Sequence, residues 1–366
     1  MSKHIFVIVW LAIILLISKT INVYQREVVM GKEVYRVNKV FAFLAVLPLI
    51  WIAGTRQSFI DTGLYIQNFN TAPNTFAELP AYLDTMEKDT GFWLLAALIR
   101  ILISKDSLVY LSILAFIHGI IVMAVYRKYS TSFFTAIFLF VASTDYLSWM
   151  HNGIRQFTAV VIIFAATPLM LKKKYFPLII TILLASLIHG SALLMLPIVF
   201  IVQGKPWNKK TMLAVCAVVI AIAFVGQFTD VLDSLLSDTQ YTNVVTDWQT
   251  LEDDGTNLVR VFVYSIPTIL SIIGYRYIKA ADDPVINLAC NMSIVSTALY
   301  CLSAVTSGIY VGRLPIYCSL YGTGILLPWE IDNVFTKKSA QIIQIMMIGA
   351  YLVFYYYQTH FVWGII

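Results

Sequence analysis

The sequence predicts an all-α polytopic membrane protein. Of its 366 residues, 59% are hydrophobic and only 12% are charged, a composition that excludes a soluble domain. Apolar runs recur along the chain, and lysines gather in alternate connections between them, as the positive-inside rule requires. The basic residues form no long stripe, so no nucleic acid is expected as a partner. We predict about 10 transmembrane helices, and up to 12, in a single integral membrane domain over residues 1–366.

The N-terminal part is predicted to begin outside the cytoplasm. An apolar run at residues 5–17 is followed by a basic connector, 19–39, which the positive-inside rule places in the cytoplasm. The second span, 40–54, leads to the first extracytoplasmic segment, 55–107, which is mainly acidic. Within it, the apolar run 91–103 is short for a span and interrupted by an arginine. We interpret it as an interfacial or re-entrant helix, with a full span as the alternative.

The middle of the chain is predicted to contain a broken helix. Spans at 108–126, 133–149 and 153–171 come first, and the last ends at three consecutive lysines, which indicate the cytoplasm. The next apolar run, 176–202, has basic residues near both ends and is interrupted by His189-Gly190-Ser191. Two half-helices that enter and leave the membrane, with their tip near His189, satisfy this charge pattern. One long tilted helix is the alternative.

The C-terminal part contains a second large loop. A span at 211–227 precedes the loop 228–258. This loop has seven acidic residues and no lysine or arginine, so we place it on the extracytoplasmic side. Further spans are predicted at 259–278, 285–305, 312–327 and 342–363. The four cysteines all lie inside apolar runs, which indicates packing residues and neither a disulfide framework nor a metal site. No metal and no cofactor are expected.

Four arginines depart from the charge rule. On the predicted topology they lie near the outer membrane boundary on four different helices: Arg56, Arg155, Arg260 and Arg313. Charges at membrane depth are costly, and the guanidinium group binds phosphate with two parallel hydrogen bonds. The pattern therefore predicts a site for an anionic lipid or sugar at the outer face. The alternatives are arginines that snorkel to lipid headgroups or pair with the acidic loops.

Short motifs in a fixed order extend over most of the chain. They are Arg56 with Asp61-Thr62-Gly63 and Tyr65, then Gly91-Phe92, Gly153-Ile154-Arg155-Gln156, Ile188-His189-Gly190-Ser191-Ala192, and Gly312-Arg313 with Tyr317. In this order they resemble the EpsG family, which is similar to the Wzy-type polymerases of bacterial exopolysaccharide, capsule and O-antigen. Two positions depart from the family pattern. Gln57 stands where an acidic residue is expected, and Asp89-Thr90 stands where Glu-Pro is expected. Changed specificity and lost activity both remain open.

The resemblance implies a glycosyltransferase of the polysaccharide polymerase type. Such an enzyme would join undecaprenyl-diphosphate-linked oligosaccharide repeat units, one as donor and one as acceptor, at the outer face of the bacterial cytoplasmic membrane. Membrane lipid, a flippase and a chain-length regulator would be its further partners. The leaving lipid diphosphate develops negative charge, which arginines can stabilise without a metal.

The motif residues then take candidate roles. Arg155 would stabilise the diphosphate, and Asp61 or His189 would be the base for the acceptor hydroxyl. Asp61 alternatively forms a turn or helix cap, and His189 alternatively holds a polar kink. The remaining candidates are substrate-binding residues: Arg56, Tyr65, Asn152, Gln156, Arg260, Arg313 and Tyr317.

Two other functions fit a polytopic chain with buried arginines. A transporter or flippase of a lipid-linked or anionic sugar would use broken helices and charged groups as well. No repeated halves are visible in the sequence, and the arginines gather at one face and not at the midplane. A membrane acyltransferase that modifies surface polysaccharide would use a histidine, but the arginines would then lack an obvious role.

Overall fold

The computed structural model describes residues 3–236, 250 and 253–364. It is 76% helical with almost no strand, which confirms the predicted all-α class. The chain divides into two compact units, residues 1–193 with 341–366, and residues 194–340. Each unit is described by itself.

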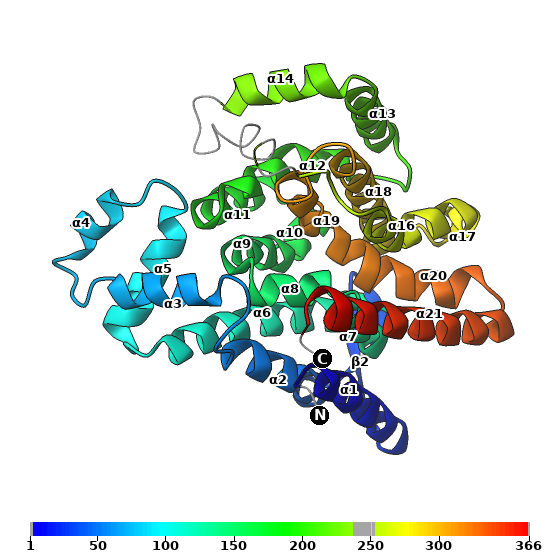
Figure 1. The fold of residues 1–366 in the computed structure, drawn as a ribbon. Helices are drawn as coiled ribbons and strands as arrows, with labels where there is room; N and C mark the ends of the chain where they lie inside the picture. Colours follow the sequence, from blue (N-terminus) through cyan, green and yellow to red (C-terminus); the bar gives the residue numbers. More distant parts are fainter. Residues whose placement is uncertain (1–2, 237–249, 251–252, 365–366) are drawn as a thin grey trace. The chain divides into compact units, whose positions relative to one another are not determined.

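The first unit holds the N-terminal helices and most of the last helix (Figure 1). Its elements are α1 (Lys3–Thr20), β1 (Tyr24–Val29), β2 (Lys32–Val37), α2 (Lys39–Gly54), α3 (Thr62–Thr71), α4 (Leu79–Asp84), α5 (Thr90–Leu102), α6 (Ser107–Tyr129), α7 (Phe133–Ala142), α8 (Asp145–His151), α9 (Ile154–Ala165), α10 (Thr167–Leu171) and α11 (Tyr175–Ile188). The 3-10 turn η1 (Gly190–Leu194) and helix α21 (Lys337–Tyr357) cross the unit boundary, and the π-helical turn η4 (Gln358–Val362) follows α21.

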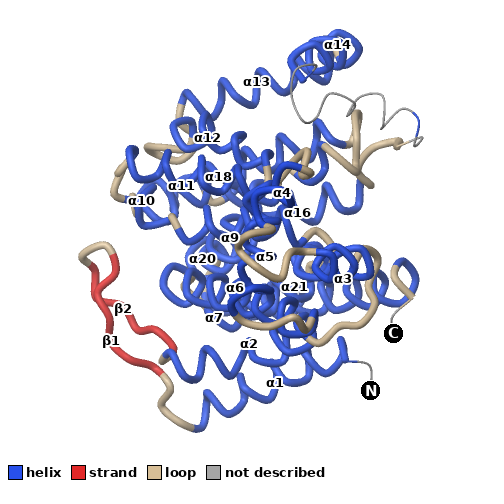
Figure 2. Tube along the Cα trace, turned by 90° about the vertical axis from the view of Figure 1, so that its left-hand side faces the viewer, coloured by secondary structure: helices blue, strands red, loops and turns tan. Residues whose placement is uncertain are grey.

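A β-hairpin occupies the connector after the first helix (Figure 2). Its strands pair antiparallel from Tyr24↔Val37 to Val29↔Lys32. Met30 and Gly31 at the tip both have positive φ, 51° and 80°, as a two-residue hairpin turn that matches the strand twist requires. The sequence prediction treated this segment as a plain connector. Two short segments that contain valine and tyrosine, one on each side of Met30-Gly31, are the signal that predicts it.

Helix α6 lies at the centre of the first unit. It contacts α2 along its length and also contacts α9. Close approach between α6 and α2 depends on small residues: a Cβ at Gly119 would lie 2.3 Å from the Ile50 side chain, and one at Gly54 would lie 2.8 Å from the Ser112 backbone. Buried aromatic residues of α3, α5 and α6 form a hydrophobic cluster beside α9, in which the Phe69 and Tyr110 rings stack 4.4 Å apart.

The second unit is built around α18. Its elements are α12 (Met195–Ile201), α13 (Lys209–Ala223), α14 (Val225–Leu236), α16 (Leu258–Ile273), α17 (Tyr275–Ala281), α18 (Pro284–Ser303), the 3-10 turn η2 (Val311–Arg313), α19 (Ile316–Tyr321), the π-helical turn η3 (Gly322–Leu326) and α20 (Leu327–Val334). Helix α18 contacts α13, α16 and α19. Hydroxyl groups join α16 to α18, since Thr268 bonds Ser293 and Thr297 at 2.8 Å each.

The number of membrane spans differs from the sequence prediction. In the described residues, four helices are long and apolar enough to cross a membrane: α1, α6, α18 and α21 with η4. Three bent pairs bring the number to seven: α7 with α8 at 71°, α13 with α14 at 105°, and α16 with α17 at 74°. The predicted 10 to 12 spans are therefore not confirmed, because runs predicted as single helices bend and others form shorter apolar helices of 10–17 residues.

The structure gives the bounds of three predicted elements more exactly. The run 153–171 forms two helices, because Pro168 cannot continue an α-helix and α9 ends at Ala165. The predicted acidic loop 228–258 begins inside α14, and residues 237–249 and 251–252 lie outside the described residues. The run 176–202 breaks at His189, as predicted; how its two halves lie in a membrane stays a prediction.

Candidate active site

The first turn of α9 is the point where the motif residues of the first unit meet. Gln156 donates from Nε2 to Ser191 Oγ at 3.3 Å, and Gln156 is almost fully buried. Asn152 precedes the helix, because α8 ends at His151 and α9 begins only at Ile154. Its Oδ1 accepts a hydrogen bond from the backbone N–H of Asp61 at 3.0 Å. Hydrogen bonds therefore connect the segments around Asp61 and Ser191, which are far apart in sequence, at the N-terminus of α9.

Arg155 forms an ion pair with Asp89. Its Nη1 donates to Asp89 Oδ2 at 2.9 Å, and its guanidinium lies 5.6 Å from the centre of the Trp93 ring. A cation in the first helical turn opposes the helix dipole, so the carboxylate partner offsets an unfavourable charge. The Arg155 side chain is 26% exposed, whereas that of Asp89 is only 3% exposed. Arg155 has five N–H donors, and the ion pair with Asp89 leaves most of them for another anion.

Asp89 is a residue that the sequence prediction did not include in the site. It has a φ of 57°, a strained conformation for a residue other than glycine, and it starts α5 without a side-chain capping bond. Its carboxylate instead reaches Arg155 and accepts a bond from the Gly190 N–H at 3.4 Å. Burial raises the pKa of Asp89, while the Arg155 charge and the Gly190 bond lower it, and the net pKa is raised. The only sequence signal is an acidic residue two positions before the Gly91-Phe92 motif.

Gly91 lets α5 approach the end of α11. A Cβ at Gly91 would lie 2.8 Å from the carbonyl carbon and the carbonyl oxygen of Leu187, a distance that Cβ atoms do not tolerate. This approach is what places Asp89 next to Gly190. The motif glycine therefore serves the geometry of the Arg155–Asp89 pair.

We expect Gly91→Ala to destabilise the protein by about 1–3 kcal/mol, because the added methyl group overpacks a backbone contact. Thermal unfolding of the purified protein measures this. Gly63→Ala is the matched control: Gly63 lies in α3, no atom stands within 4 Å of the new Cβ, and alanine favours the helix. Equal stability of the two variants would contradict the inferred close contact.

His189 ends α11 in an extended conformation, with φ −157° and ψ 117°. Its Nδ1 lies 2.8 Å from Ser191 Oγ, the same hydroxyl that Gln156 reaches. Nδ1 also accepts a bond from the backbone N–H of Ser191 at 3.4 Å, so this nitrogen holds the Ser191 segment at the end of α11. Both predicted roles of His189, the base and the polar kink, stay predictions.

Asp61 stands at the N-cap position of α3 but does not cap the helix. Its side chain makes no capping hydrogen bond, and Tyr65 N–H bonds the Asp61 backbone carbonyl at 3.1 Å. Asp61 therefore has the position of a helix cap, as the alternative role predicts, but its side chain does not form the capping hydrogen bond. Asp61 is half-buried, and Asn152 holds its backbone beside the start of α9.

Arg56 and Tyr65 are more deeply buried than predicted substrate contacts would be. Arg56 is 6% exposed, donates from Nε to Thr62 Oγ1 at 3.1 Å, and also donates from Nη1 to the carbonyl of Ala53. Its Nη2 is buried without a partner among the described residues. Tyr65 is 6% exposed and meets the Phe92 ring edge to face. In this structure both residues support the α3 segment from inside.

The remaining candidates lie in the second unit. The guanidinium of Arg260 lies 6.0 Å from the centre of the Tyr300 ring, Arg313 is exposed at the end of η2, and Tyr317 is buried at the start of α19. Gly312, next to Arg313, packs close to Thr256, where a Cβ would lie 2.5 Å from the hydroxyl. Arg260 is four residues after Thr256, so the two arginines belong to one end of this unit.

Asp253 stabilises the loop at residues 307–309, which precedes Gly312 and Arg313. Its carboxylate accepts bonds from the Ser307 hydroxyl at 2.6 Å and from the N–H groups of Gly308 and Ile309 at 2.9 Å each. Burial raises the pKa of Asp253, but these bonds outweigh it and the net pKa is lowered. The charged form therefore stabilises the loop at neutral pH.

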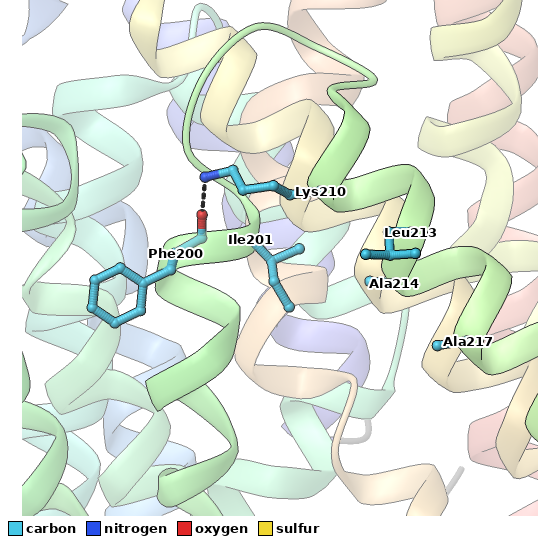
Figure 3. A pocket seen from close by; sticks show the side chains of 6 residues that line it. All are labelled: Phe200, Ile201, Lys210, Leu213, Ala214 and Ala217. Carbon is cyan, nitrogen blue, oxygen red and sulfur yellow. Dashed lines mark hydrogen bonds between the residues drawn. The ribbon is translucent and has the colours of Figure 1, made fainter.

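A pocket on the second unit does not involve the predicted site residues (Figure 3). It has a volume of about 290 Å³ and is lined by Phe200, Ile201, Lys210, Leu213, Ala214 and Ala217. Lys210 donates to the carbonyl of Phe200 and so caps the end of α12. Among the residues that the structure describes, no group of three or more His, Cys, Asp or Glu side chains could hold a metal ion.

Comparison with known families completes the description. A family model for EpsG matches residues 39–363, which is nearly the whole chain and includes every motif of both units. The chain belongs to the EpsG family. The predicted resemblance is thereby confirmed. EpsG proteins are bacterial, and membership associates this membrane protein with polysaccharide biosynthesis. No curated protein and no solved structure matches the chain.

Proposed function

We propose that this EpsG protein is a polysaccharide polymerase. It would transfer a growing oligosaccharide chain from undecaprenyl diphosphate to the next lipid-linked repeat unit at the outer face of the bacterial cytoplasmic membrane. The observation that carries the proposal is the meeting of Arg155, Asp89, Gln156 and the His189 segment at the start of α9. Family membership supports a polymerase of the glycosyltransferase kind.

The proposed reaction needs a positive group that stabilises the leaving diphosphate and a base that accepts the proton of the acceptor hydroxyl. The oxygen of the acceptor hydroxyl bonds to the anomeric carbon of the donor sugar, and the bond from that carbon to the diphosphate breaks. The diphosphate leaves with the bonding electrons, and the hydroxyl proton passes to the base. Arg155 stabilises the leaving charge through donors that Asp89 does not use, since fixed donors in a partly buried site need little reorganisation.

Asp89 acts as a positioning residue in this proposal. Its two oxygens hold Arg155 on one side and the Gly190 N–H on the other, so it keeps the arginine close to the His189 segment. Bases in glycosyl transfer must reach the attacking hydroxyl, and both His189 and Asp61 are joined to the start of α9 through one intermediate residue. Arg260 and Arg313 of the second unit are proposed to bind further anionic parts of the substrates.

The transporter and acyltransferase alternatives explain less of this geometry. A transporter would need its charges at a site reached from both faces, but the arginine–aspartate pair occupies one helix start. An acyltransferase would use His189 without a task for Arg155. The polymerase proposal gives both residues a role in the same step.

Deletion of the gene tests the proposal. We expect lipid-linked single repeat units to accumulate and polymer to disappear, because polymerisation is the step removed. Extraction and mass analysis of lipid-linked glycans measure both species, and a plasmid-borne wild-type copy should restore the polymer. Repeat units trapped on the cytoplasmic leaflet would point to a flippase. Full-length polymer that lacks only an acyl group would point to an acyltransferase.

A further inference from the structure

Glu330 in α20 is a buried carboxyl group without a visible partner. It is 0% exposed, and neither of its carboxylate oxygens has a hydrogen-bond partner among the described residues. An unpaired charge in a low-dielectric interior costs several kcal/mol, so such a group is retained only where something compensates it. Ionisable residues inside membrane proteins are for this reason functional candidates by default.

The helix packing shows what Glu330 faces. Val334 is one helical turn after Glu330 on the same face of α20, and its side chain lies 2.5 Å from the position of a Cβ on Gly274. Gly274 follows the last residue of α16, where that helix bends by 74° into α17. Glu330 therefore lies on the face of α20 that packs toward the C-terminal end of α16. Carbonyl groups at such an end carry partial negative charge.

A second unpartnered oxygen belongs to α18. The Oδ1 atom of Asn287 is buried and has no partner among the residues that the structure describes. Its Nδ2 donates to Asp282 Oδ1 at 3.1 Å, which fixes the amide so that Oδ1 cannot exchange places with the nitrogen. Asn287 is one helical turn before Asn291 in α18. Trp207 donates both to Asn291 Oδ1 at 3.0 Å and to Ser271 Oγ at 3.2 Å, and Ser271 is three residues before Gly274. This part of α18 therefore lies beside the end of α16 that Glu330 faces.

No positively charged side chain among the described residues bonds to these oxygens. Helix α16 carries Arg260, but at its opposite end, about 20 Å from Gly274 at 1.5 Å per residue. Lys205 pairs with Asp282 at 3.9 Å, and Arg276 and Lys279 of α17 are exposed. The other titratable groups on the elements around Glu330 are Tyr264 on α16, Tyr275 and Tyr277 on α17, Cys290, Tyr300 and Cys301 on α18, and Asp332 on α20 itself, and η3 contributes none. The π-helical turn η3 directly precedes α20, a distortion that is frequent at functional sites.

We propose that Glu330 and Asn287 bind a small monovalent cation, Na⁺ or a proton, at the bend between α16 and α17. The shared chemistry is a set of buried oxygens that needs one positive charge. Carbonyls at the ends of broken helices coordinate Na⁺ or H⁺ in other membrane proteins, and the α16 end offers such carbonyls here. The site is separate from the arginines, because Glu330 is 17 residues after Arg313 along the α19–η3–α20 segment.

Thermal unfolding of the purified full chain in detergent tests the proposal. A ligand that binds only the folded state raises the Tm, by about 2 °C for each tenfold rise in concentration above its Kd in a chain of this length. One arm compares sodium chloride with choline chloride at pH 9. The other lowers the pH from 10 to 6 in choline chloride. We expect the Tm of the wild-type protein to rise in one arm, which identifies the ion. Glu330→Gln should be folded, and its Tm should stay unchanged in both arms.

Two further variants keep the result interpretable. Asn287→Ala should weaken the response by about tenfold in concentration, since it removes one oxygen and leaves the carboxyl group, and it serves if Glu330→Gln fails to fold. Asp230→Asn is the control, because Asp230 is an exposed carboxylate of the same unit, and it should respond as the wild-type does. A wild-type Tm that neither ion changes, or a full response in Glu330→Gln, overturns the proposal.

Discussion

Arg155→Lys should slow polymerisation by about 10 to 150 times while the protein level stays unchanged. A lysine can keep the ion pair with Asp89 and can reach the membrane surface as well as an arginine. It is a point charge, however, and it lacks the planar fork that forms two parallel hydrogen bonds to one phosphate while Asp89 stays bound. Loss of one charge-assisted hydrogen bond costs about 1.5–3 kcal/mol, which corresponds to this range of rates. Polymer length and lipid-linked repeat units, measured at equal expression, give the rate.

A matched substitution separates phosphate binding from a general effect of arginine. Arg276→Lys changes an arginine in α17, outside the candidate site, and should leave polymer at the wild-type level. Thermal unfolding of Arg155→Lys should match the wild-type protein, since the Asp89 partner remains paired. Wild-type polymer from Arg155→Lys would remove the residue from the reaction and, with it, the main support for the polymerase mechanism.

The elements that the sequence predicts well are those whose signals are local. The span at 108–126 appears as α6, because an uninterrupted apolar run ends at Arg127 and Lys128. The break at His189 follows from a polar triplet inside an apolar run, and the structure ends α11 one residue before it. Hydrophobic length and charge position are enough for both, since each depends on a few neighbouring residues.

The features that escaped prediction depend on contacts between distant segments. Nothing near Asp89 in the sequence indicates that α5 approaches the end of α11 through Gly91, so the Arg155–Asp89 pair could not be derived. Glu330 was left in a connection after a predicted span at 312–327, whereas the helix continues through the π-helical turn and buries it. The bends at 224 and 274 lie inside the predicted spans 211–227 and 259–278, and no proline stands at either bend to indicate them.

The structure brings candidate site residues together where they share one helix start. Arg155 and Gln156 belong to one motif, and both make long-range hydrogen bonds at the start of α9. Arg56 and Tyr65 were expected to bind substrate, and the structure places them inside the protein. The sequence alone does not distinguish an arginine that binds a ligand from one that donates to a backbone carbonyl, as Arg56 does. Their assignment to the substrate stays a prediction.

His189→Ala should reduce polymerisation by about 10² to 10⁴ times if the imidazole is the general base. His189→Asn distinguishes this role from a kink. Asparagine can still hydrogen-bond Ser191 and maintain the end of α11, but it cannot accept a proton at neutral pH. A base therefore predicts that both variants are inactive and folded, with repeat units accumulating. If His189 only maintains the kink, His189→Asn should keep activity and His189→Ala should lower the Tm.

The competing base is tested by Asp61→Asn, which keeps the size of the side chain and leaves the backbone bond to Asn152 intact. If His189 accepts the proton, Asp61→Asn should retain most of the activity, whereas His189→Asn should lose it. If Asp61 accepts it, Asp61→Asn loses the same 10² to 10⁴ while His189→Asn stays active. Polymerisation by the purified protein on lipid-linked repeat units decides between them. Activity in both asparagine variants would exclude both residues as the base and leave the acceptor proton to another group.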